Sequence, residues 1–233
     1  MVVPRAVAFS AAHYFGLLLE RAERAERAGN YAIAAALVTR QSGREVIVHG
    51  ANTMFQRHNP AGHAEMDAIL TARDIGLAGP SDRAGTFRTL VERGEVILRP
   101  APDMGRECVL YTTLEPCPMC TVCLLNSGVE RVVIAVEDPI AGSLSPDRLR
   151  SLPSLWTEFA TSLDIQWGQT DNPDDPSTYV PPDLRAALVE TFMRSRVALD
   201  SVLDANGVLD LRALHAVAAA YAAGADEGRT AVP

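Results

Sequence analysis

The chain has 233 residues, of which 48% are hydrophobic and 21% charged, so it is long enough for one generous globular domain or for one domain with an appendage. Its formal net charge is −8, and its 21 basic residues are all arginines, scattered without a dense cluster. This balance argues against a nucleic-acid groove. No segment reaches the roughly 20 consecutive apolar residues of a membrane-spanning helix. The apolar stretch 6–19 lacks a clear cleavage site, so we expect a helix there rather than a signal peptide.

The first half of the chain predicts a helix, a strand hairpin and a second helix. Ser10 is a favoured N-cap for a helix that ends near residue 28. The apolar runs 31–39 and 45–50 predict two largely buried strands. Asn59-Pro60 precedes a helical run over 64–74. The following segment, 76–107, is rich in glycine, proline and charge, and we interpret it as an insertion whose role the sequence does not reveal.

The second half alternates strands and helices before it becomes irregular. The predicted elements are a strand at 108–113, a helix at 118–127, a strand at 131–136, a helix at 146–160, a short strand at 164–168, and tail helices at 184–203 and 209–223. The alternation predicts an α/β sheet with right-handed crossovers. We therefore predict a main domain over residues 1–168, followed by a linker or arm over 169–183 that is rich in proline and acidic residues. Residues 184–233 are predicted to form a helical C-terminal extension, whose role the sequence does not reveal.

Two short motifs carry the chemistry of this sequence. One is His63-Ala64-Glu65, and the other is Cys117-Pro118-Met119-Cys120. Either motif alone is weak evidence, but together they supply one imidazole, two thiolates and one unattached carboxylate. Three protein ligands on a tetrahedral Zn²⁺ leave a fourth position for water, which is the arrangement of a catalytic zinc site. We expect both motifs to open helices, whose positive ends would favour thiolates near the metal.

The four cysteines fall within sixteen residues, at positions 108, 117, 120 and 123, which is no disulfide framework for a chain of this length. A reducing compartment, the cytoplasm, fits better. Cys117 and Cys120 alone could also be a redox pair or half of a structural zinc site. With Cys123 they begin like an iron–sulfur run, but no fourth cysteine follows. We expect Cys108 and Cys123 to take no part in the metal site.

Residues 10 to about 142 resemble the cytidine deaminase-like superfamily through the two motifs, the second read as Thr113-Leu114-Glu115-Pro116-Cys117-Pro118-Met119-Cys120. The guanine deaminase and tRNA adenosine deaminase branches are nearest in pattern. The resemblance implies an α/β fold, a three-layer α/β/α sandwich around a five-stranded mixed sheet. It also implies zinc on His63, Cys117 and Cys120, with Glu65 as proton shuttle, Asn52 bonded to the substrate ring, and a homodimer.

The activity expected from these residues is hydrolytic deamination of a small aminated heterocycle, a nucleobase or nucleoside. Zinc-activated hydroxide attacks the ring, Glu65 moves the protons, and ammonia leaves. The Glu-Pro-Cys-Pro-Met-Cys segment most resembles that of guanine deaminases, and this resemblance implies a guanine-like ring. The acidic charge favours a small molecule over nucleic acid. The alternatives are a tRNA adenosine deaminase, a specialised-metabolite deaminase, and a noncatalytic protein stabilised by zinc.

The loop before the first motif is expected to line the pocket because it leads directly into His63. We expect Phe55 in this loop to stack on a planar ring, and we leave His58 open between a pocket residue and a surface residue. Ala64, between the proposed ligand and the proposed base, is grouped with the substrate-contacting residues. The remaining histidines, His13, His49 and His215, are read as ordinary core or surface residues.

Overall fold

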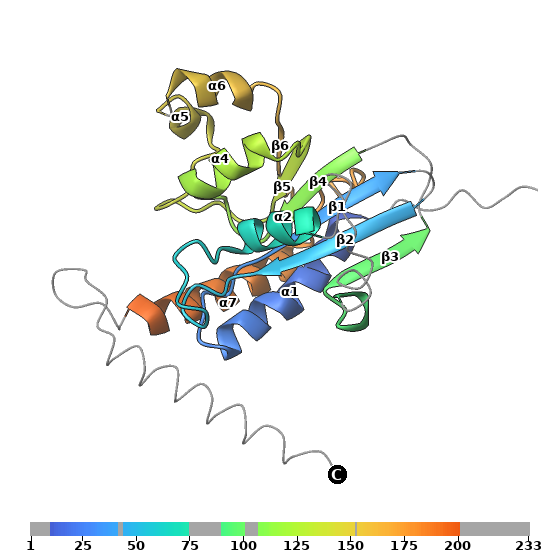
Figure 1. Cartoon of the computed structure of the whole chain (residues 1–233), viewed down its shortest axis with the longest axis vertical. Helices are drawn as coiled ribbons and strands as arrows, with labels where there is room; N and C mark the ends of the chain where they lie inside the picture. Colours follow the sequence, from blue (N-terminus) through green and yellow to red (C-terminus); the bar gives the residue numbers. More distant parts are fainter. Residues whose placement is uncertain (1–9, 42–43, 75–89, 101–106, 152, 201–233) are drawn as a thin grey trace, which may run out of the picture.

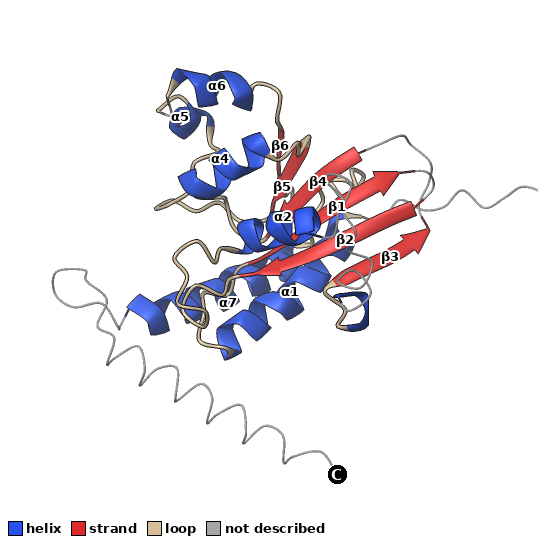
Figure 2. Cartoon of the chain, in the orientation of Figure 1, coloured by secondary structure: helices blue, strands red, loops and turns tan. Residues whose placement is uncertain are grey.

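The computed structural model describes residues 10–41, 44–74, 90–100, 107–151 and 153–200. They form a six-stranded mixed sheet in the order β3-β2-β1-β4-β5-β6, with helices on both faces (Figures 1 and 2). The strands β1, β2 and β3 are antiparallel to their neighbours, β4 is antiparallel to β1, and β4, β5 and β6 run parallel. The strands are β1 (Ala34–Gln41), β2 (Arg44–Ala51), β3 (Val96–Pro100), β4 (Glu107–Thr112), β5 (Arg131–Ile134) and β6 (Asp164–Trp167).

The layered α/β fold is as predicted, but the described sheet has six strands where five were expected. The additional strand is β3, which pairs antiparallel with β2 and lies inside the segment that we interpreted as an insertion. Its apolar run, Val96-Ile97-Leu98, is short and flanked by charge, glycine and proline, so its sequence carries little strand signal. Other parts of that segment, 75–89 and 101–106, lie outside the described residues.

Several of the described helices begin at a capping residue or a proline. Ser10 caps the first helix, because its side-chain oxygen accepts a hydrogen bond from the His13 amide at 3.3 Å. The predicted helix over 146–160 is instead two short helices, because Pro153 cannot donate the backbone hydrogen bond that would continue the first one. The helices are α1 (Ala11–Arg27), α2 (Ala64–Asp74), α4 (Pro118–Asn126), α5 (Pro146–Leu149), α6 (Ser154–Ala160) and α7 (Pro182–Asp200).

The sheet has an apolar core on each face. On one face Tyr14, Phe15 and Leu18 of α1 are fully buried, together with Leu188 of α7. On the other face α2 and α4 pack against the strands through residues such as Ala68 and Leu124. None of the described helices is long and apolar enough to cross a membrane.

The segment before α7 lies against the rest of the fold. Gln169 and Tyr179 form an isolated parallel bridge, Val180 is fully buried, and the Ala11 amide donates to the Pro176 carbonyl at 2.8 Å. Helix α7 then runs beside α1 (Figure 1). The second predicted tail helix, 209–223, and His215 lie outside the described residues.

Candidate active site

The two motifs meet because α2 and α4 begin at the same edge of the sheet. His63 immediately precedes α2, and Glu65 is the second residue of that helix. Cys117 is the N-cap residue of α4, with extended backbone at φ −71° and ψ 169°, and Pro118 follows it at the start of the helix. This local geometry brings Cys120 into the first turn of α4, on the side of Cys117. Both helices thus direct their partially positive N-termini toward the cluster.

The structure gathers His63, Cys117 and Cys120 into a group with metal-binding geometry. Their ligand atoms all lie within 4.8 Å of one another, and His63 Nδ1 is 3.6 Å from each cysteine Sγ. A tetrahedral zinc with bonds of about 2.3 Å to sulfur and about 2.0 Å to nitrogen would separate those two atoms by roughly 3.6 Å. The donor set and its spacing therefore fit zinc.

The electrostatics of the two cysteines also suit a metal site. The pKa of Cys117 is lowered to about 4, chiefly because the Cys120 thiol donates a hydrogen bond to its sulfur. The same hydrogen bond raises the pKa of Cys120, and burial adds to this effect. The hydrogen bond to Cys117 raises the pKa of His63, against the opposing effect of burial. A thiolate is thus formed at Cys117 near neutral pH, and the thiolate is the form of cysteine that binds metals.

Glu65 stands beside this cluster without belonging to it. The carboxylate is 4% exposed, and its Oε2 lies 3.5 Å from Cys120 Sγ. Burial raises the pKa of Glu65 above that of an exposed glutamate. A carboxyl group whose pKa is raised by burial is a stronger base than an exposed one, so beside a metal site it is suited to accept a proton and return it.

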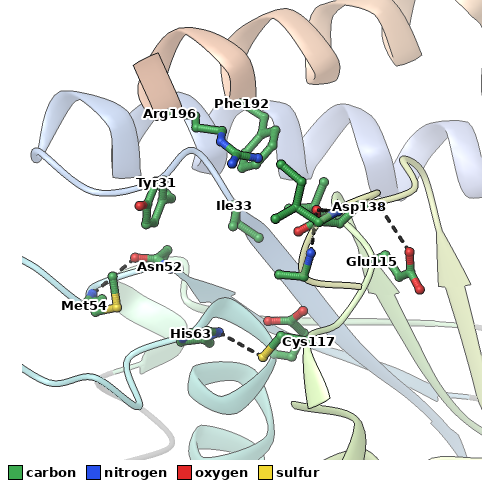
Figure 3. Close-up of a pocket in the computed structure, with 14 residues that line it drawn as sticks. Tyr31, Ile33, Asn52, Met54, His63, Glu115, Cys117, Asp138, Phe192 and Arg196 are labelled. Carbon is green, nitrogen blue, oxygen red and sulfur yellow. Dashed lines mark hydrogen bonds between the residues drawn. The ribbon is translucent and has the colours of Figure 1, made fainter. Parts of the chain in front are cut away.

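A cavity of about 220 Å³ opens above the cluster (Figure 3). His63 and Cys117 lie on its floor, and Phe192 and Arg196 of α7 lie on the opposite side (Figure 3). Glu65 also lines the cavity. The cavity is lined by Tyr31, Ile33, Asn52, Met54, His63, Glu65, Leu114, Glu115, Cys117, Asp138, Ile140, Ala141, Phe192 and Arg196.

The structure separates the predicted substrate residues. Asn52 is 2% exposed and lines the cavity, and its Oδ1 accepts a hydrogen bond from the Met54 amide at 3.2 Å, which leaves Nδ2 as the group that can donate to a ligand. Phe55 lies outside the cavity lining and packs against Tyr31, with ring centroids 5.5 Å apart. His58 also lies outside it, exposed in a turn with φ 50°. Ala64 is fully buried in the core between α2 and the sheet.

Glu115 holds a loop of the cavity in place, a role that was not predicted from the sequence. Its Oε1 accepts from the amides of Leu144 and Ser145 at 2.8 and 3.1 Å, and its Oε2 accepts from the Asp138 amide at 3.1 Å. Arg148 adds an ion pair at 3.3 Å. The carboxylate, fully buried, therefore holds the loop over residues 138–145, which brings Ile140 and Ala141 to the cavity. Its position two residues before Cys117 was the available signal.

For the other cavity residues, the sequence offered little indication that they would line a site. Tyr31 and Ile33 lie at the start of a run that we interpreted only as a buried strand, and Asp138 follows the end of β5. Phe192 and Arg196 carry no motif, and they reach the cavity only because α7 packs back against α1. Cys108 and Cys123 are not part of the cluster of potential ligands formed by His63, Cys117 and Cys120.

Comparison with known proteins identifies the class to which this site belongs. The zinc-binding region of cytidine and deoxycytidylate deaminases matches residues 10–136, more than half of the chain. The chain belongs to this deaminase family. The matched region contains all three residues of the cluster, and Glu65.

Among curated relatives, the tRNA-specific adenosine deaminase of Haemophilus influenzae is 29% identical over 126 residues, and that of Bacillus subtilis is 30% identical over 129 residues. These matches cover 54% and 55% of this chain, and 58% and 63% of the relatives, so the chain spans less than two thirds of either. Among solved structures, the guanine deaminase from Nitrosomonas europaea aligns with a TM-score of 0.51 at 23% identity, covering 80% of this chain and 87% of its own. That likeness supports the fold.

Proposed function

We propose that this protein is a zinc-dependent aminohydrolase that removes the amine of a small aminated heterocycle, a nucleobase or nucleoside, with a guanine-like ring favoured. The observation that carries the proposal is the buried carboxylate of Glu65, which lies beside the His63, Cys117 and Cys120 cluster and lines the same cavity. A zinc site that served only for stability would need four protein ligands and no adjacent free carboxylate.

In the proposed reaction, water adds to the ring carbon that bears the amine, the carbon–nitrogen bond breaks, and ammonia leaves. His63, Cys117 and Cys120 hold the zinc, which when bound supplies the Lewis acidity that activates water. Glu65 accepts the first proton that water loses and gives it to the neighbouring ring nitrogen. It then takes the proton from the hydroxyl group on the tetrahedral ring carbon and gives it to the departing amine, so that a carbonyl group and ammonia form. Asn52 donates its Nδ2–H to the ring and fixes its orientation, because its Oδ1 is already engaged by Met54.

The charge of the chain supports a small substrate over tRNA. Binding of a polyanion depends on lysine and arginine contacts to phosphates. This chain has a net charge of −8 and no lysine, and the cavity lining holds three acidic residues, Glu65, Glu115 and Asp138, against one arginine. In addition, α7 contributes to the cavity from outside the region that matches the family.

A tRNA adenosine deaminase is the second candidate, because the two bacterial relatives described above carry that name. A deaminase for a specialised metabolite would have the same machinery with another ring. We further propose that the protein works as a cytoplasmic homodimer, which light scattering of the purified protein tests. None of the four cysteines, which all lie among the described residues, forms a disulfide, and this supports a reducing location.

The experiment that tests the proposed function is an ammonia-release assay on wild-type protein and Glu65→Gln. The assay covers guanine, adenine, cytosine, their nucleosides, other aminated heterocycles and tRNA. We expect turnover of a small ring by the wild type and a loss of well over about a hundredfold in Glu65→Gln, with zinc content retained. Full turnover by the variant would refute the shuttle role. Turnover of tRNA and of no small ring would select the second candidate.

A zinc-loaded wild-type protein that releases ammonia from none of these compounds would favour the noncatalytic alternative, a binding protein stabilised by zinc. Glu65→Asp is a useful companion variant because it retains the carboxylate and shortens its reach. We expect it to retain more activity than Glu65→Gln, which retains the shape and loses the charge.

A further inference from the structure

Helix α7 presents an aromatic ring and a guanidinium group to the side of the cavity that faces the metal cluster. Phe192 and Arg196 are four residues apart, so they lie on one face of the helix. Both line the cavity and lie across it from His63 and Cys117 (Figure 3). Arg196 is the only arginine or lysine among the lining residues. The helix begins at Pro182, well beyond the region that matches the family, which ends at residue 136.

This face of α7 is held firmly in place. Ser195, between the two cavity residues, is 1% exposed, and its Oγ accepts from the Ala32 amide at 2.9 Å and donates to the Phe192 carbonyl at 2.7 Å. Ala32 lies between Tyr31 and Ile33, which also line the cavity. The Ser195 hydroxyl thus fixes the helix to the neighbouring wall.

A second attachment of α7 lies on the preceding residue, Arg194. Arg194 makes a bidentate ion pair with Glu26 of α1, with Nε–Oε1 and Nη2–Oε2 distances of 2.6 and 2.7 Å. Glu26 is 6% exposed, so the pair is partly shielded from water. Arg196 and Phe192 are therefore placed by a preorganised helix rather than by a loose tail, which is what selective recognition of a ligand requires.

We propose that Arg196 and Phe192 determine substrate specificity by contacting the part of the heterocycle opposite its reacting carbon. This inference rests on the proposed function, and it assigns the substrate as a 2-amino-6-oxopurine of the guanine type. If the 2-amino carbon faces Glu65 and the metal, the O6 and N7 acceptors lie at the far side of the purine. A guanidinium group binds those two adjacent acceptors bidentately. Phe192 supplies an apolar contact to the ring.

The same geometry disfavours other rings. A purine with an amine at position 6 presents a donor where guanine presents O6, and two donors face each other unfavourably. A pyrimidine is shorter and cannot offer the paired acceptors. Lysine at position 196 would keep the charge but lose the planar fork that matches the two acceptors.

The test compares guanine with two analogues, 2-aminopurine, which lacks O6, and 2,6-diaminopurine, which carries an amine there. Both keep the reacting 2-amino carbon. Wild type, Arg196→Ala, Arg196→Lys and Phe192→Ala are assayed for kcat/KM on each ring. Met193→Ala is the matched control, because Met193 lies on the same turn of α7 but is 47% exposed and does not line the cavity.

We expect the wild type to prefer guanine over both analogues, and Arg196→Ala to lower kcat/KM for guanine by about 10- to 100-fold while changing the analogues little. The kcat/KM of Arg196→Lys for guanine should lie between those of the wild type and Arg196→Ala. Phe192→Ala should lower kcat/KM for all three rings by a similar factor, and Met193→Ala should change none. Equilibrium dialysis of guanine against Glu65→Gln and Glu65→Gln/Arg196→Ala provides a readout without turnover, with a weakening of about tenfold or more expected.

Equal losses on guanine and 2-aminopurine in Arg196→Ala, with zinc content and melting temperature unchanged, would overturn the assignment of Arg196 to O6. A wild-type enzyme that deaminates another ring but not guanine would overturn the substrate class and leave the proposed deaminase activity standing. A wild-type protein with full zinc and no turnover of any ring would count against the proposed function itself. If Arg196→Ala does not fold, the milder Arg196→Lys, which retains the side-chain length and charge, decides the matter.

Discussion

Polar side chains are buried at both ends of the sheet, but at one end they face a cavity and at the other they bond to one another. At the end where β4 finishes, His63, Glu65, Cys117 and Cys120 converge beneath a cavity, with separations of 3.5–3.6 Å among them. At the other end, where β1 meets the start of β4, the buried polar groups bond to one another at much shorter distances. The register of β1 on β4, from Ala35 opposite Thr112 to Arg40 opposite Glu107, separates the two ends by the length of a strand.

The second cluster is centred on Arg40. Its Nε donates to Glu45 Oε2 at 2.8 Å, its Nη1 to Glu107 Oε2 at 2.6 Å, and its Nη2 to the Tyr14 hydroxyl at 2.7 Å. Tyr14 in turn donates to Glu45 Oε2 at 2.6 Å, and its ring stacks on Tyr111 with centroids 4.3 Å apart. Burial raises the pKa of Tyr14, and the hydrogen bond to Glu45 raises it further.

The two clusters show that buried polar groups can serve either the stability of the fold or the binding of a ligand. Charges that are fully engaged with one another, as at Arg40, fix the register of strands and the position of α1, and nothing is left to bind a ligand. Groups that face a cavity, as Glu65 does, remain accessible to a metal, water or substrate. Mutations at the two ends should therefore change different properties.

The largest expected effect is at the metal end. Cys120→Ala should lose zinc and with it detectable ammonia release, because one of three protein ligands is removed, and the melting temperature should fall since metal binding contributes to folding. Cys123→Ala, on the same helix, is the control, with zinc and activity retained. Zinc analysis by mass spectrometry with the ammonia assay checks both. Retention of stoichiometric zinc by Cys120→Ala would contradict the assigned ligand set.

The next effect is at the opposite end of the sheet and concerns stability. Arg40→Met should lower the free energy of unfolding by about 3–5 kcal/mol, because it leaves Glu45, which is fully buried, without its charged partner. Zinc content and kcat/KM of the folded fraction should stay near wild type. Urea denaturation measures the change. Arg150→Ala, which breaks the exposed pair with Asp147, is the control, with a change below about 1 kcal/mol.

A double variant distinguishes the contribution of balanced charges from that of the hydrogen bonds. Arg40→Met/Glu45→Leu removes both charges and should recover much of the lost stability, because no unpaired charge stays buried. A double variant no more stable than Arg40→Met would mean that the cluster contributes through hydrogen bonds to Tyr14 and Glu107 rather than through the balance of its charges.

A smaller effect is expected where the cavity wall depends on tight packing. A Cβ at Gly142 would overlap the Glu115 carboxylate and lie 2.6 Å from the Asp138 carbonyl oxygen. Gly142→Ala should therefore displace the loop over 138–145 and raise KM by about tenfold with zinc retained, since a small shift of positioning residues is costly. Gly16→Ala is the control because its Cβ meets nothing within 4 Å, and it should leave KM unchanged. Unchanged kinetics in Gly142→Ala would show that the loop does not position the substrate.

The sequence predicted the parts of the molecule that depend on local patterns. The motif spacing predicted the cluster of His63, Cys117 and Cys120, and the caps and apolar runs predicted most helices and strands. The cavity wall on α7 could not be predicted, because Phe192 and Arg196 join the site only through packing of α7 against α1. Phe55 was expected at the cavity from its place in the loop before His63, and His58 was left open, but neither lines the cavity: Phe55 packs against Tyr31 and His58 is exposed. The edge strand β3 depends on pairing with β2, which a short apolar run does not reveal.

We expect the zinc site to have two cysteine ligands, one histidine ligand and an open fourth position. X-ray absorption at the zinc edge of the purified wild-type protein measures this ligand set. We predict two sulfur scatterers at about 2.3 Å and two nitrogen or oxygen scatterers at about 2.0–2.1 Å, one from His63 and one from water. A first shell of three or four sulfurs, which would include Cys108 or Cys123, would instead indicate a closed structural site without a position for water.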